Sequence, residues 1–261
     1  MVSYQTVTEL PGGKASKEQL ERLYQRYRFA YQFCKGKDVL EVACGAGQGL
    51  GYLAGAAKTV VGGDIDQENL KFAKTKYEQR NNIRIELLDA QKISFSDKSF
   101  DVVIFYEAIY YLKEAERFFD EAYRILREDG LLVICTANKD WGDFNPSPFS
   151  TRFFSVPELN SLLVQKFYDV KFYGGFKVKT NGLRTVIISL IKRIAIFLKI
   201  IPKTMKGKEF FKRLFFGQLL PLPAEIYEGM TEYIEPVPVA ADLPNDDYKV
   251  IFAVGRKRGW K

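Results

Sequence analysis

The sequence contains no histidine and only three cysteines. The missing imidazole excludes a Ser-His-Asp or Cys-His nucleophile system, histidine as a general base and the common histidine-containing zinc sites. Cys34, Cys44 and Cys135 show neither a pairing pattern nor a metal-ligand spacing. They indicate reduced thiols in a cytoplasmic protein, and no bound metal is predicted. Any catalysis must therefore use a carboxylate, a phenol, an amine or a bound cofactor.

The sequence also shows no uncharged apolar run long enough to cross a bilayer. Its most apolar segment, residues 186–201, is interrupted by Lys192, Arg193 and Lys199, whereas a membrane-spanning helix needs about 20 residues with few charges. The amino terminus has neither a basic region nor an apolar stretch, so no signal peptide is expected. With 261 residues, 47% of them hydrophobic, the chain can form one large domain or a domain with an insertion.

One stretch combines a strand, a glycine-rich turn and a helix. An apolar run of strand length, residues 39–43, leads into a turn with Gly45 and Gly47, and apolar residues then recur at helical spacing from Leu50. A second apolar run ends on Asp64, nineteen residues after Gly45. In such an arrangement the glycines let the backbone approach a ligand, and the acid binds ribose hydroxyls. The pattern predicts a nucleoside site at the carboxyl end of a parallel sheet.

The spacing distinguishes between two kinds of nucleoside site. The dinucleotide fingerprint requires glycine at its sixth position, counted from Gly45, where this chain has Leu50. An acid, three residues and Gly-x-Gly, here Glu41 to Gly47, instead resembles motif I of the class I S-adenosylmethionine-dependent methyltransferases. Ala43 stands where that family usually has glycine, a departure that tightens the loop. The resemblance implies S-adenosylmethionine as cofactor, and an NAD-dependent oxidoreductase remains the less favoured alternative.

The same resemblance implies roles for individual residues. The implied cofactor site consists of Tyr27, Glu41, Gly45, Gly47, Asp64, Ile65, Asp89, Ala90 and Tyr106. In it Asp64 holds the ribose, while Asp89 and Ala90 meet the adenine; for Asp89 the alternative is a simple turn or cap. Arg26 and Tyr27 lie on an amphipathic helix predicted over residues 14–33. The resemblance implies that they reach the methionine end of the cofactor; the alternative is that this helix only packs on the sheet.

The group that activates the acceptor is expected among the residues after the fourth predicted strand. Many members of the resembled family have Glu-His where this chain has Tyr110 and Tyr111, and a phenol with a pKa near 10 is a poor base unless perturbed. We therefore name Glu107 and Tyr111 as candidate catalytic residues, with packing or capping as the alternative role of each. We expect a small or lipid-linked acceptor, such as a sugar or a quinone-like phenol, in preference to protein or nucleic acid. This expectation depends on aromatic residues predicted to surround the mouth of the active site, at positions 105, 106, 110, 111, 141, 144 and 149.

Alternating strands and helices predict an α/β protein with a doubly wound, Rossmann-like sheet. The resemblance implies seven strands, the last of them antiparallel. Residues 1–176 and 248–261 form the predicted methyltransferase domain, and residues 177–247 are an insertion between strands six and seven. An alternative of another class is a nucleoside-binding or interaction protein on the same fold that has lost catalysis.

The insertion has its own charge pattern. Eleven Lys or Arg residues stand against one acid between positions 177 and 213. Apolar helix faces beside such cations are typical of helices that lie in a membrane interface. Residues 182–219 are therefore expected to contact the inner face of a membrane; a helical cap or a dimer interface is the alternative. Residues 225–247, which include seven acids, are expected to form an irregular lid.

Overall fold

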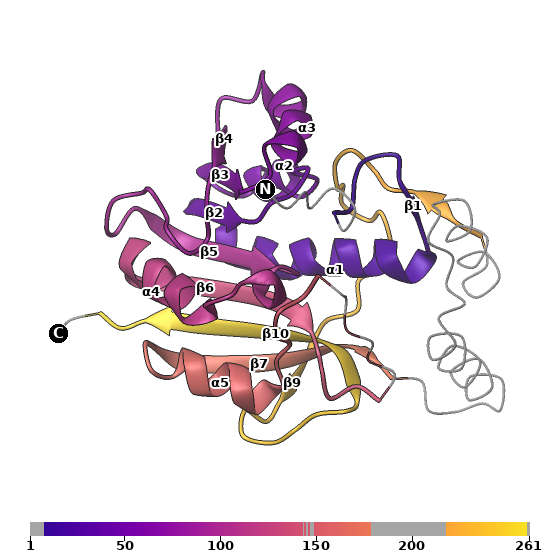
Figure 1. The fold of residues 1–261 in the computed structure, drawn as a ribbon. Coiled ribbons are helices and arrows are strands. Elements are labelled where there is room, and N and C mark those ends of the chain that lie inside the picture. Colours follow the sequence, from indigo (N-terminus) through magenta and orange to yellow (C-terminus); the bar gives the residue numbers. More distant parts are fainter. Residues whose placement is uncertain (1–7, 143, 145, 147–148, 179–217, 260–261) are drawn as a thin grey trace.

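The computed structural model describes residues 8–142, 144, 146, 149–178 and 218–259, and a mixed sheet runs through it (Figure 1). Eight strands lie in the order β4-β3-β2-β5-β6-β10-β7-β9. Five neighbouring strands are parallel: β2 (Asp38–Val42), β3 (Thr59–Asp64), β4 (Ile83–Leu87), β5 (Phe100–Tyr106) and β6 (Leu126–Ala137). Next to them, β10 (Tyr248–Lys257) lies antiparallel between β6 and β7 (Phe167–Lys177), as the predicted last strand requires.

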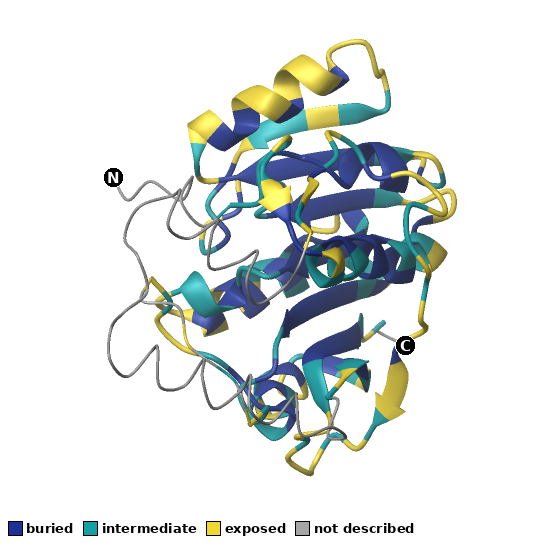
Figure 2. Ribbon diagram, turned by 90° about the vertical axis from the view of Figure 1, so that its right-hand side faces the viewer, coloured by how far each residue is buried: buried dark blue, intermediate teal, exposed yellow. Residues whose placement is uncertain are grey.

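Helices cover both faces of the sheet, which explains why most residues of its central strands are apolar. One hydrophobic cluster packs one face against α1 (Lys17–Cys34), α2 (Leu50–Ala54) and α3 (Gln67–Tyr77). A second cluster packs the other face against α4 (Ala115–Ile125) and α5 (Val156–Leu163). Figure 2 shows the buried residues concentrated in the central strands and the exposed ones on the outer sides of the helices. The predicted doubly wound α/β class is confirmed.

The amphipathic helix predicted over residues 14–33 starts later than expected, because a capping box defines its first turn. Ser16 Oγ accepts a hydrogen bond from the backbone N–H of Gln19 at 3.3 Å, and the Gln19 side chain accepts one from the Ser16 N–H at 3.0 Å. The two residues before Ser16 form β1 (Lys14–Ala15), which pairs with β8 (Leu220–Pro221) in a separate two-stranded sheet. This small sheet joins the residues before α1 to the part of the insertion that contains β8.

Two details of the sheet differ from the prediction. The main sheet has eight strands instead of seven, because β9 (Val237–Val239) pairs with the edge strand β7 within the segment expected to be an irregular lid. Pro238 lies in β9, and proline is tolerated at such an edge. In addition, the sequence predicts a turn at Gly130 before the fifth strand, but β6 begins earlier, at Leu126. A bulge interrupts its pairing with β5, and Asp129 takes the left-handed conformation with φ 60°.

The basic part of the insertion lies outside the described residues. The proposed membrane-contacting segment, residues 182–219, falls almost entirely in the range 179–217, so its helical character and the predicted division into domains stay predictions. Within the described part of the chain, no helix is both long and apolar enough to span a membrane. The described remainder of the insertion contains β8 and β9 and runs back over α1 and α2.

Candidate functional site

A cavity of about 520 Å³ lies at the carboxyl ends of β2, β3, β4 and β5, where α1 forms one of its walls. Adjacent parallel strands end there together, which is where open α/β sheets bind ligands. The cavity brings together ten of the eleven residues proposed from the sequence: Tyr27, Glu41, Gly45, Asp64, Ile65, Asp89, Ala90, Tyr106, Glu107 and Tyr111. Gly47 does not line it, because this residue faces α3, and its carbonyl accepts a hydrogen bond from Tyr77 Oη at 2.8 Å.

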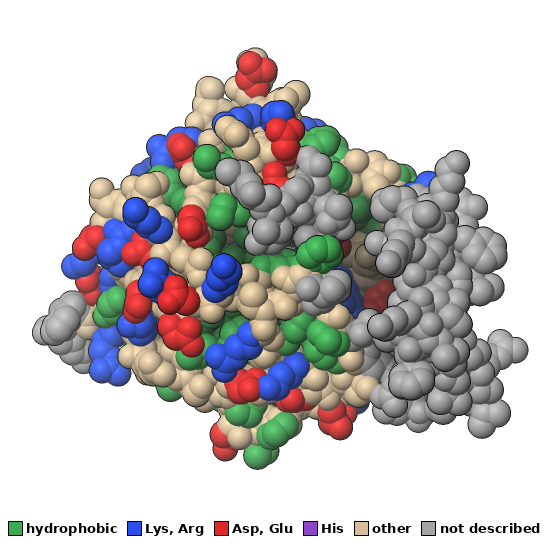
Figure 3. All heavy atoms as spheres, viewed as in Figure 1, with side chains coloured by type: hydrophobic (Ala, Val, Ile, Leu, Met, Phe, Trp, Pro, Cys, Tyr) green, Lys and Arg blue, Asp and Glu red, His purple; other side chains and the backbone are tan. Residues whose placement is uncertain are grey.

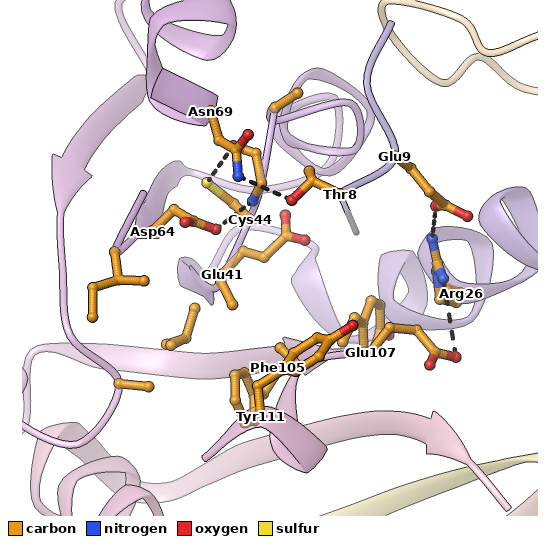
Figure 4. A pocket seen from close by; sticks show the side chains of 18 of the residues that line it. Thr8, Glu9, Arg26, Glu41, Cys44, Asp64, Asn69, Phe105, Glu107 and Tyr111 are labelled. Carbon is orange, nitrogen blue, oxygen red and sulfur yellow. Dashed lines mark hydrogen bonds and ion pairs between the residues drawn. The ribbon is translucent and has the colours of Figure 1, made fainter. Parts of the chain in front are cut away.

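Glu41 is a buried carboxyl group at the centre of this cavity (Figure 4). The Tyr27 hydroxyl donates to Glu41 Oε1 at 2.5 Å, while Oε2 has no hydrogen-bond partner among the described residues. Burial raises the pKa of Glu41 to about 7; the hydrogen bond from Tyr27 opposes this rise and the charge of Asp64 adds to it. An unpartnered buried oxygen that can carry charge near neutral pH is suited to a cationic ligand group.

The position of Tyr27 depends on Gly49, the N-cap residue that precedes α2. A Cβ atom at Gly49 would lie 1.8 Å from Tyr27 Cε1, so any larger residue would collide with the ring. Tyr27 is held on its other side by the ring of Tyr106, whose centroid is 5.7 Å away in an edge-to-face arrangement. The glycine loop thus makes room for the side chain that donates a hydrogen bond to Glu41.

The loop after β2 is hydrogen-bonded directly to Asp64, the last residue of β3. Ala43 and Gly45 both adopt left-handed backbone conformations, each with φ 57°. In this geometry the Gly45 N–H donates to Asp64 Oδ2 at 2.8 Å, and the Asp66 N–H donates to Oδ1 at the same distance. Because a carboxylate has about four acceptor positions, Asp64 keeps capacity for a diol. Burial raises the pKa of Asp64, and the two backbone donors oppose this rise only in part.

The residues proposed to surround an adenine lie after β3 and β4. Ile65 is 51% exposed, and its apolar side chain lies on the cavity wall with Ala90. One oxygen of Asp89 accepts a hydrogen bond from the Gln91 N–H at 2.8 Å, which is the turn role considered as the alternative for this residue. Such a contact uses one oxygen and leaves the other available to a donor such as an exocyclic amine.

Glu107 follows β5 directly and lies on the opposite side of the cavity from Asp64 (Figure 4). The hydroxyl of Tyr110 donates to Glu107 Oε2 at 3.1 Å, and Arg26 Nη1 lies 4.0 Å from Oε1. Burial raises the pKa of Glu107, and Arg26 partly opposes this rise. Glu107 has φ 50°, an uncommon backbone conformation for a non-glycine residue. Tyr111, in the 3-10 turn η1 (Ile109–Tyr111), also lines the cavity.

Sequence reasoning missed several residues of this site. Thr8 and Glu9 cross the cavity from the amino-terminal side: Asn69 Nδ2 donates to Thr8 Oγ1 at 3.0 Å, and Arg26 Nη2 lies 2.8 Å from Glu9 Oε2. No motif marks these contacts, since they join distant parts of the chain. Conversely, the aromatics expected at the mouth at positions 141, 144 and 149 do not line the cavity, whereas those at 105, 106, 110 and 111 do.

The charges of the lining favour a ligand with net positive charge. Five carboxylates stand against three cationic side chains: Glu9, Glu41, Asp64, Asp89 and Glu107 against Arg22, Arg26 and Lys113. On the face of the molecule shown in Figure 3, acidic and basic side chains are interspersed. The lining of the cavity differs from that face in its excess of acidic side chains.

Comparisons with known proteins identify what this architecture resembles. Residues 40–134 match the family model of the methyltransferase domain. Over 166 residues the chain is 33% identical to a Mycobacterium tuberculosis protein named "Probable S-adenosylmethionine-dependent methyltransferase", covering 59% of this chain and 58% of that protein. It is also 36% identical, over 36% of each chain, to a phthiotriol/phenolphthiotriol dimycocerosates methyltransferase of the same species. The chain thus spans little more than half of the first relative and about a third of the second.

A solved structure shows the same fold over nearly the whole chain. An S-adenosylmethionine-dependent methyltransferase from Thermotoga maritima matches with a TM-score of 0.56, covering 92% of this chain and 95% of its own. The sequence identity is 17%, so this likeness concerns the fold alone.

Proposed function

We propose that this chain, which belongs to the class I S-adenosylmethionine-dependent methyltransferase family, transfers a methyl group to a hydroxyl group of a small or lipid-linked acceptor. The observation that carries the proposal is that one cavity holds the glycine loop, the acids Asp64 and Asp89 at the ends of β3 and β4, and a further carboxyl group, Glu107. The first three features are those of the cofactor half of the site. Glu107 provides a proton acceptor in the other half.

The cavity fits S-adenosylmethionine on its charges and on its unpartnered groups. This cofactor carries a sulfonium and an ammonium group against one carboxylate, and the lining has an excess of carboxylates. Glu41, whose Oε2 has no partner among the described residues, would hold the cationic methionine end together with the Gly45 backbone. Asp64 would hold the ribose, while Ile65, Asp89 and Ala90 would surround the adenine.

The chain's own contribution to catalysis is alignment, exclusion of water and removal of a proton. The bound cofactor supplies an electrophilic methyl group, and holding the acceptor in line with it contributes roughly 7–11 kcal/mol. Glu107 accepts the hydroxyl proton; its raised pKa brings this carboxylate closer to the range in which a general base works at neutral pH. Tyr110 orients Glu107 through its hydrogen bond, and Arg26 stabilises the charged form. Tyr111 remains the alternative base.

The acceptor class is inferred from the aromatic wall and from a relative. Phe105, Tyr106, Tyr110 and Tyr111 line the cavity around Glu107, and such rings favour an apolar or planar acceptor. One relative is named for the dimycocerosates that it methylates. Both points favour a lipid-linked or aromatic acceptor over protein or nucleic acid.

Turnover with methyl-labelled S-adenosylmethionine tests the proposal. The protein is incubated with the cofactor and, separately, with catechol, with free sugars and with an organic-phase lipid extract; S-adenosylhomocysteine and transferred label are measured. We expect turnover in at least one mixture and a loss of about 10²-fold or more in Glu107→Gln, with cofactor binding retained. Cofactor binding without turnover in any mixture would favour the alternative of an inactive binding protein, and binding of NAD instead would favour an oxidoreductase.

A further inference from the structure

The returning part of the insertion contacts the glycine loop from outside the cavity. Residues 220–234 are all described, and none of them lines the cavity. The Ile226 N–H donates to the carbonyl of Gln48 at 2.9 Å, and Gln48 Nε2 donates to the carbonyl of Pro223 at 2.7 Å. Gln48 itself lines the cavity. Two hydrogen bonds in opposite directions therefore fix this loop residue to the returning segment.

Glu225 lies between these two contacts and is held by two cations, Lys76 in the last turn of α3 and Arg80 just beyond that helix. Its carboxylate is 2.8 Å from Arg80 Nη2 and 3.3 Å from Lys76 Nζ, and its side chain is 18% exposed. The same carboxylate occupies the space beside Gly51 of α2, where an added Cβ atom would lie 2.0 Å from Glu225 Oε1. Gly51 and Glu225 thus fit each other, although 174 positions separate them in the sequence.

A second line of contacts leads from Glu225 back to the loop. The Arg80 guanidinium lies 5.6 Å from the ring centroid of Tyr77, within cation–π range. Tyr77 Oη donates to the carbonyl of Gly47 at 2.8 Å. Glu225 is therefore connected to two consecutive loop residues, to Gly47 through Arg80 and Tyr77 and to Gln48 through the hydrogen bonds of its neighbours.

The returning segment also holds the amino-terminal wall of the cavity. Leu222 exchanges backbone hydrogen bonds with Gly12 and Gly13 at 2.9 and 2.7 Å, and these residues lead to Thr8 and Glu9. Leu222 and Ile226 are buried in the same hydrophobic cluster as α1 and α2. Glu228 accepts hydrogen bonds from the hydroxyls of Tyr24 and Tyr52. Both the loop and the amino-terminal wall are thereby attached to one segment.

We propose that Glu225 is a positioning residue for the cofactor: by its contacts with Arg80, Lys76 and α2 it keeps the returning segment against the glycine loop, in the conformation that binds. This inference rests on the proposed function, because it assigns to Glu225 an effect on affinity for S-adenosylmethionine. Glu225 does not touch the reacting groups. Its loss therefore weakens cofactor binding and leaves the transfer step unchanged at saturating cofactor.

The test compares two charge-neutralising variants of the full chain by isothermal titration with S-adenosylmethionine. Glu225→Gln removes the ion pairs, and Glu232→Gln removes the same charge from an exposed position of the same segment. We expect the Kd to rise about 3- to 30-fold in Glu225→Gln and to change less than about 2-fold in Glu232→Gln. In turnover assays the KM for the cofactor rises with the Kd, while kcat and the KM for the acceptor stay at wild-type values.

A double-mutant cycle separates this role from a general loss of structure. In Gly51→Ala the added methyl group displaces the Glu225 carboxylate, so this variant should weaken cofactor binding as Glu225→Ala does, and the double variant should be no weaker than either. Equal Kd values for wild type and Glu225→Gln, or additive losses in the double variant, would overturn the inference. Failure of the wild type to bind the cofactor would instead refute the proposed function.

Discussion

The residue with the clearest dependence on pH is Glu41. Its pKa in the folded protein is about 7, whereas an unperturbed glutamate titrates near 4.3. Between these two values the folded state binds a proton that the unfolded state has released. The free energy of unfolding therefore falls as pH rises through this window. Asp64 and Glu107, whose pKa values are also raised by burial, act in the same direction.

We predict that Glu41→Gln makes the cofactor-free protein more stable and the cofactor site weaker. At pH 8 the free energy of unfolding should rise by about 1–3 kcal/mol, since a buried charge is replaced by an amide that still accepts from Tyr27. At pH 4 it should change little. Urea denaturation at both pH values measures the difference, and titration with S-adenosylmethionine should show a loss of affinity of about tenfold or more. The same gain at both pH values would contradict this account.

Ala43 is a residue at which the family's usual glycine would be favoured. Its φ of 57° lies in the left-handed region, where a non-glycine residue costs about 1–2 kcal/mol. Glycine relieves this strain but makes the unfolded chain more flexible, so Ala43→Gly should stabilise the protein by about 0.5–1 kcal/mol. Ala46→Gly is the matched control, because Ala46 is buried in the same loop without a positive φ, and it should destabilise. Equal losses in both variants would show that Ala43 is not strained.

At the scale of elements, the contact between α1 and the start of α2 depends on the absence of a side chain at position 49. Gly49→Ala would place a methyl group 1.8 Å from the Tyr27 ring, which is buried and held by Tyr106. Such overpacking costs about 1–3 kcal/mol or more. We therefore expect a lower melting temperature in calorimetry, together with weaker cofactor binding. Gly142→Ala should leave both unchanged, because a Cβ atom there has no neighbour within 4 Å.

The elements that could be predicted from the sequence are those with local signals. The apolar runs before the glycine turn and before Asp64 correspond to β2 and β3, whereas α1 begins three residues later than predicted because the capping box of Ser16 defines its first turn. By contrast, β9 has three residues and one of them is proline, so its pairing with β7 is decided by the tertiary structure. The left-handed conformation of Asp129 could not be predicted from local signals either, because it belongs to a bulge that forms only where β6 pairs with β5.

Four acids of the site could be located from the sequence because each lies at or just after the carboxyl end of a strand. Parallel strands bring these ends together, so Glu41, Asp64, Asp89 and Glu107 converge without any further information. The contacts made by Glu9 with Arg26, or by Tyr110 with Glu107, depend on side-chain packing between elements, which no spacing in the sequence encodes. The contact with Tyr110 opposes the rise in the pKa of Glu107 that burial causes.

At the scale of the whole molecule, a bound cofactor should stabilise the fold measurably. The cavity joins four strands, α1 and the amino-terminal segment, so ligand that binds only the folded state stabilises all of them together. At a concentration about 100 times the Kd, the gain is about 2.7 kcal/mol. For a protein of this size we expect the melting temperature to rise by about 5–10 °C with S-adenosylmethionine. NAD at the same concentration is the control and should produce no shift; a shift with NAD alone would favour the oxidoreductase alternative.

The position of β10 has a consequence for the order in which the sheet assembles. This strand hydrogen-bonds to β6 on one side and to β7 on the other, so it is the only link between the five parallel strands and the β7–β9 edge within the described sheet. During synthesis β7 is made well before β10, so the edge of β7 that pairs with β10 stays unpaired until the intervening residues and β10 have been made. The parallel half can form first from contacts that are closer along the chain. We therefore expect the sheet to close in a late step, when β10 pairs with both β6 and β7.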